Sequence, residues 1–94
     1  MDVAYNSSVM LTEYMDLAMR KAHYEVMENG HFFGTIAPCR GCWGEGTTLE
    51  ECRDELRGAL ECWILVGVRH GDELPVIDGI DLNPKVYAET GQMA

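Results

Sequence analysis

The sequence is poor in basic residues, and it contains no long apolar run. It has 7 Lys and Arg against 16 Asp and Glu, which gives a formal net charge of −9. A chain of this charge repels the phosphate backbone of nucleic acids, so we expect no direct DNA binding. No apolar run approaches the roughly 20 residues that a membrane span requires, and we therefore expect no membrane partner.

The N-terminal sequence "MDVAYNSSVM" also lacks the basic start and apolar core of a secretory signal, which predicts a cytoplasmic protein. In that compartment the four cysteines are expected to be reduced thiols, not a disulfide framework. The acidic surface would attract a basic partner and speed its encounter. The alternative is that the charge only keeps a small protein soluble, and charge alone favours neither interpretation.

At 94 residues the chain is expected to form one domain, spanning 10–82, between a flexible N-terminus (1–9) and a flexible C-terminal tail (83–94). Apolar residues recur at helical spacing from Met10 to about Ala22, which predicts a first helix. Asn29-Gly30 predicts a two-residue type I′ turn between two strands, with Val26 opposite Phe33. In that register both faces of the hairpin are apolar, so a helix, a second subunit or a partner must cover each face. One face would carry Tyr24, Val26 and Phe33, and the other would carry Met27, Phe32 and Ile36.

Glycines punctuate the next stretch and leave room for a short strand from Cys42 to Glu45. Thr48 and Glu51 then form a capping box that opens a long helix, which is expected to end near His70-Gly71. A further short strand is predicted from Val76 to Leu82. The apolar stripe of the long helix comprises Leu49, Cys52, Leu56, Ala59, Leu60, Trp63 and Gly67.

The C-x-x-C motif of Cys39 and Cys42 has the spacing of a zinc or redox site. However, Cys52 and Cys62 on the long helix would lie ~15 Å apart along its axis and cannot share one metal ion. A fourth ligand would have to come from one of the three histidines, so we expect no metal site and no cofactor. A thiol–metal protein is the weaker alternative. The carboxylates have no nucleophile as partner and no P-loop is present, so we expect no catalytic residue and no enzyme.

Several motifs in order resemble one family. A strand ends at Glu28 before Asn29-Gly30, an aromatic strand follows with Phe32-Phe33, Gly41-Cys42 and Gly44-x-Gly46 come next, and "TLEE" opens the long helix. Over Leu11–Leu82 the chain resembles the HicB-like antitoxin family, and specifically its short members without a C-terminal DNA-binding domain. The sequence departs from the family at "APCRG", where the usual turn is "PDLPG", and there Cys39 and Cys42 look like buried or half-buried small apolar residues.

The resemblance implies an α+β, partial ribonuclease H-like fold with an N-terminal helix, a three-stranded antiparallel sheet, a long helix and a short final strand. It also implies a homo-oligomer, either a dimer or a tetramer. As an antitoxin of a type II toxin–antitoxin system, the protein would bind and neutralise a small basic HicA-type mRNA-cleaving toxin. The alternative is an orphan homo-oligomeric HicB-like module with no toxin partner.

Two sets of residues are singled out by these arguments. The candidate partner or oligomer interface comprises Met27, Phe32, Phe33, Ile36 and Trp43. For Phe33 and Trp43, a position in the core is the alternative to a position at an interface. The structural motif residues are Asn29, Gly30, Gly41, Thr48 and Glu51.

Overall fold

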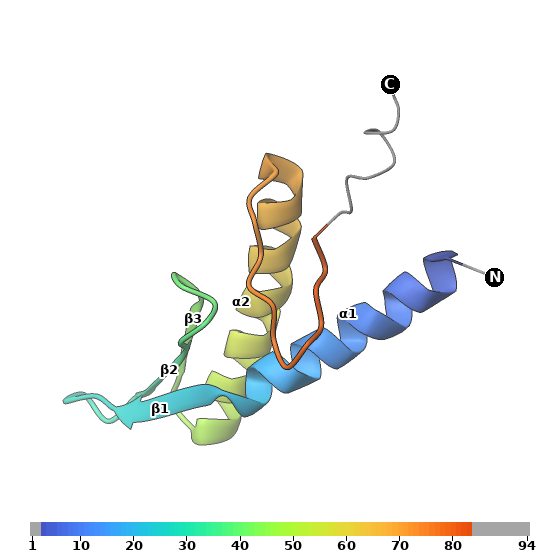
Figure 1. Ribbon diagram of the computed structural model, residues 1–94. Coiled ribbons are helices and arrows are strands. Elements are labelled where there is room, and N and C mark those ends of the chain that lie inside the picture. Colours follow the sequence, from blue (N-terminus) through green and yellow to red (C-terminus); the bar gives the residue numbers. More distant parts are fainter. Residues whose placement is uncertain (1–2, 84–94) are drawn as a thin grey trace.

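The computed structural model describes residues 3–83, with side chains described from Met10 onward (Figure 1). The elements in chain order are α1 (Val3–Arg20), β1 (Ala22–Val26), β2 (Phe32–Ile36), β3 (Trp43–Gly46) and α2 (Leu49–His70). The strands form one antiparallel sheet in the order β1-β2-β3, and α2 lies against one face of it. The predicted α+β class is therefore confirmed. The predicted C-terminal tail lies outside the described residues, except for Asn83.

Helix α1 begins at Val3, well before the Met10 that the sequence pattern indicated. The segment expected to be flexible contains neither proline nor glycine after Met1, so nothing in it ends a helix that is anchored further along. The anchor is the buried pair Tyr14 and Ala18, which belongs to the hydrophobic core.

The β1–β2 hairpin differs from its prediction by one residue. Val26 pairs with Phe32 instead of Phe33. The N–H of Met27 donates to the carbonyl oxygen of His31 at 2.7 Å, and the N–H of Gly30 donates to that of Met27 at 2.9 Å. Gly30 has a φ of 87°, so this is a three-residue loop that ends in a left-handed glycine, not a type I′ turn.

This shift exchanges the faces of the two phenylalanines, because successive side chains leave opposite sides of a strand. Phe32 lies on the face that α2 covers, and Phe33 lies on the other face, which we call the open face. The predicted assignment of two apolar faces was wrong, since the open face mixes aromatic with polar side chains. Its residues are His23, Glu25, Phe33, Thr35, Trp43 and Glu45.

Helix α2 approaches the sheet closely because glycines face it. A Cβ at Gly44 would lie 2.5 Å from the backbone nitrogen of Leu56, and a Cβ at Gly46 would lie 2.5 Å from that of Cys52. Larger residues would push the helix away from the strands. The core continues from this contact toward α1, and it comprises Tyr14, Met15, Ala18, Met19, Ile36, Cys39, Cys42, Leu56, Leu60, Ile64, Leu74 and Ile77.

Both ends of α2 follow the prediction closely. The Thr48 hydroxyl accepts a 3.0 Å hydrogen bond from the N–H of Glu51, as expected of an N-cap. The Glu51 carboxylate accepts from the N–H and the hydroxyl of Thr47, at 2.9 and 2.6 Å, whereas a capping box uses the N–H of the N-cap itself, here Thr48. Gly71, with a φ of 72°, ends the helix. In the apolar stripe, Leu49 proves to be exposed and Ile64 is buried.

The strand predicted from Val76 to Leu82 is absent from the described residues, which show one isolated bridge between Ile77 and Ile80. Asp78 and Gly79 both have positive φ, at 47° and 85°, so the two-residue turn expected at Asn29-Gly30 occurs here. The segment lies between the two helices (Figure 1). The Tyr14 hydroxyl fixes it by donating to the carbonyl oxygen of Pro75 at 2.7 Å.

Candidate protein-interaction surface

The C-x-x-C motif lies in a tight turn of the core. The N–H of Cys42 donates to the carbonyl oxygen of Cys39 at 3.1 Å, and both side chains are buried. Burial raises the pKa of Cys39 to about 11 and also raises the pKa of Cys42. At neutral pH both thiols are therefore protonated, whereas metal ligands and nucleophiles are thiolates. Their predicted position as buried small residues is confirmed.

The predicted interface residues do not form one surface. Ile36 has an exposed fraction of 1% and belongs to the core, so its assignment to an interface was wrong. Met27 and Phe32 are half-buried. On the open face, Phe33 and Trp43 stack with their ring centroids 5.6 Å apart. Trp43 is 54% exposed, which excludes a place in the core of this chain.

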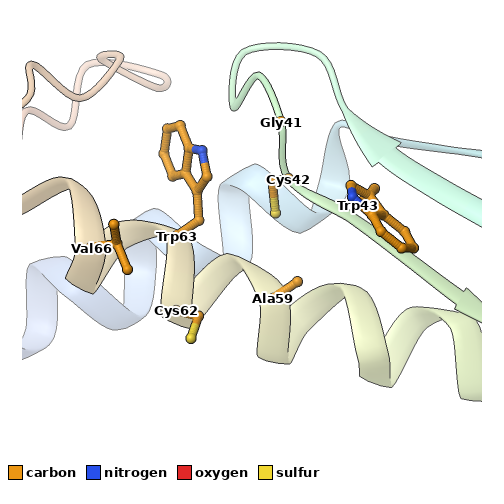
Figure 2. Close-up of a pocket in the computed structure, with 7 residues that line it drawn as sticks. All are labelled: Gly41, Cys42, Trp43, Ala59, Cys62, Trp63 and Val66. Carbon is orange, nitrogen blue, oxygen red and sulfur yellow. The ribbon is translucent and has the colours of Figure 1, made fainter.

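Trp43 also forms one wall of an apolar hollow between β3 and α2 (Figure 2). Its volume is about 410 Å³. The opposite wall is Trp63, whose indole N–H donates to the carbonyl oxygen of Arg40 at 2.9 Å and so holds the turn after β2 against α2. The lining residues are Gly41, Cys42, Trp43, Ala59, Cys62, Trp63 and Val66.

A second hollow of about 420 Å³ continues from the first along β3 and shares Trp43, Ala59 and Cys62 with it. Glu45, Asp54 and Glu55 line this hollow, together with Gly44 and Gly58, and no basic side chain does. The Glu45 carboxylate lies 2.9 Å from the Nδ1 of His31. We call the two hollows together the β3-edge groove.

The sequence pattern missed most of this groove. Cys62 and Val66 lie beside the buried stripe of α2, and Asp54 and Glu55 look like ordinary water-facing residues of an amphipathic helix. The available signal was the apolar character of Val66 outside the stripe. Recognising the groove required knowledge of which edge of the sheet lies beside these residues.

In the described part of the chain, no group of three His, Cys, Asp or Glu side chains is placed to hold a metal ion. Within residues 3–83, neither helix combines the length and apolar character that crossing a bilayer requires. The apolar and acidic groove is suited to non-covalent contact with another chain.

Comparisons with known proteins agree with this fold. A family model described as UPF0150-like matches residues 13–75. The crystal structure of TTHA0281 from Thermus thermophilus is similar, with a TM-score of 0.75 and 31% sequence identity. The similarity covers 81% of this chain and 95% of that one. No curated protein matches this chain significantly.

Proposed function

Since the chain belongs to the UPF0150-like family, we propose that it is a non-enzymatic, antitoxin-like protein. It binds and neutralises a small basic toxin of the HicA type, which cleaves mRNA. The observation that carries this proposal is a net charge of −9 combined with an exposed aromatic and acidic groove. A cationic protein is the complement of such a surface, because opposite charge steers the encounter and buried aromatic contacts hold the complex.

The burial of three of the four thiols supports a function by contact instead of catalysis. Cys39, Cys42 and Cys52 are buried, and burial raises the pKa of each. The carboxylates of the groove share their hollow with Trp43 and with the exposed thiol of Cys62. A toxin that cleaves mRNA acts in the cytoplasm, so the proposal implies that this protein is cytoplasmic as well.

The test is whether a neighbouring reading frame encodes a small basic protein and whether this chain neutralises it; the absence of such a frame would count against the proposal. Induction of that protein alone should arrest growth and cleave mRNA, and co-expression of this chain should restore growth and yield a co-purified complex. Raising the salt concentration should lower the association rate constant much more than it changes the dissociation rate constant, because charge acts mainly on the encounter. Persistent growth arrest in the presence of both proteins, with no complex, would overturn the proposal.

A second candidate is an orphan homo-oligomeric module, either a dimer or a tetramer. The observation that favours it is the exposed pair Leu65 and Val68, which lie three residues apart and so share one face near the end of α2. Burying this pair between copies would stabilise an assembly through the hydrophobic effect. Sedimentation equilibrium of the purified chain and of Leu65→Glu tests it: the variant should be monomeric, and an unchanged mass would argue against the use of this pair.

A further inference from the structure

We propose that the β3-edge groove receives an extended basic segment of the partner, which pairs with β3 as an added strand. This inference rests on the proposed function and specifies where and how the partner binds. Strand β3 has β2 as a neighbour on one side, and no segment within residues 3–83 pairs with its other side. Such an edge offers backbone donors and acceptors to an incoming strand.

The lining of the groove determines which side chains the added strand carries. Alternate residues of a strand face the same side, ~7 Å apart. A side chain at the Trp63 and Val66 end meets an apolar hollow, and one two residues away meets the carboxylates of Asp54 and Glu55. The preferred segment therefore carries an apolar residue and an arginine or lysine two positions apart.

Trp43 lies between the two hollows and contributes to both. Its exposed ring can pack on the apolar residue and on the stem of the basic one, and a guanidinium over the ring gains cation–π energy. Glu45, at the same end as the acidic hollow, adds a further carboxylate.

Charge argues for a basic partner segment and against a second copy of this chain. Pairing β3 with β3 of another copy would bring Glu45, Asp54 and Glu55 of both copies to one interface. An isologous pair doubles every group at the interface, so six carboxylates would gather there with no basic lining residue to offset them. A cationic segment removes this repulsion.

The test uses a fluorescein-labelled six-residue peptide, Thr-Val-Thr-Arg-Thr-Thr, which places a valine and an arginine two positions apart on one face of a strand, titrated with the full chain by anisotropy. An analogue with glutamate for arginine should not bind. Glu55→Gln and Trp43→Ala should each weaken binding of the arginine peptide up to about fivefold, as expected for a partly exposed contact. Glu61→Gln is the matched control, because it removes the same charge from an exposed position of α2 outside the groove.

Each outcome separates this inference from the proposed function. Equal weakening by Glu55→Gln and Glu61→Gln would overturn the groove assignment, because net charge alone would then explain binding. Toxin neutralisation that survives Trp43→Ala and Glu55→Gln together would overturn the inference and leave the function standing. Peptide binding in the groove without any toxin neutralisation would overturn the function alone. A Trp43-dependent dimer of the chain that excludes the peptide would also overturn the inference.

Discussion

At position 39, burial decides the chemistry of the side chain more than the surrounding motif does. A C-x-x-C pair is typical of zinc and redox sites because two thiolates close together hold a metal or exchange a disulfide. Here the turn from Cys39 to Cys42 points both thiols into the core, and Trp63 holds that turn through the carbonyl oxygen of Arg40. The pair acts as two small apolar residues.

The buried Cys39 thiol predicts a loss of stability at alkaline pH. Its pKa is about 11 in the folded chain against an ordinary value of 9.0, so between these values the folded state holds the proton more tightly than the unfolded state. The free energy of unfolding should therefore fall by about 1 kcal/mol between pH 8 and pH 10 through this group. Urea unfolding of the wild type and of Cys39→Ala at both pH values measures the difference. Equal losses in the two proteins would contradict the prediction.

At the scale of elements, the position of the glycines explains the hairpin register. A Cβ at Gly34 would lie 2.9 Å from the Tyr24 ring and 3.3 Å from the Cys52 sulfur. The register predicted from Asn29-Gly30 would turn Phe33 toward α2 in its place. The close contact between helix and sheet favours the three-residue loop, which places Gly34 opposite Gly44 on the face that α2 covers.

The contrast between α2 and the hairpin indicates what the sequence could predict. The caps at Thr48 and Gly71 involve residues within a few positions of each other, so a local pattern identified both. The hairpin register and the burial of Ile36 depend on a helix that follows later in the chain, and a local turn signal could not specify them. The signal for the correct register was the set of three glycines, Gly34, Gly44 and Gly46, that face α2.

Two alanine substitutions test the close approach of α2 to the sheet. Gly44→Ala places a Cβ 2.5 Å from the Leu56 nitrogen and should lower the free energy of unfolding by about 1–3 kcal/mol. Gly58→Ala, at an exposed position of α2 with nothing within 4 Å of its Cβ, should raise it by about 0.5–1 kcal/mol. Urea unfolding compares the two variants. Equal stability of both would mean that the strand and helix separate without cost.

At the scale of the whole molecule, residues 74–83, which follow α2 in the sequence, are held against the region of α1. Tyr14 of α1 binds the carbonyl oxygen of Pro75, and Lys21 lies 3.2 Å from the Asp78 carboxylate. The Asn83 side chain accepts from the N–H of Leu74 at 2.7 Å and donates to its carbonyl oxygen at 2.8 Å. These contacts close a loop over the buried side chain of Ile77. They include a bond between Tyr14 and Pro75, which lie far apart in the sequence, so a local strand pattern cannot predict them.

Asn83→Ala should open this loop selectively. The substitution removes both hydrogen bonds to Leu74 and should cost about 1–2 kcal/mol. Amide hydrogen exchange should become faster in residues 74–83 and change less in the middle of α2, which packs on the sheet. Asn83→Asp keeps an acceptor for the N–H of Leu74 and should give an intermediate effect. Uniformly faster exchange over the whole chain would show that the segment does not open independently.

The unequal surroundings of the two indoles give this protein a built-in optical reporter. Trp43 is largely in contact with water, whereas Trp63 is half-buried and engaged with a backbone carbonyl. Emission from Trp43 should lie at longer wavelength and be quenched readily by iodide, and emission from Trp63 should respond mainly to unfolding. Replacing either indole by phenylalanine separates the two signals, so occupancy of the surface and integrity of the fold can be followed in one unlabelled sample.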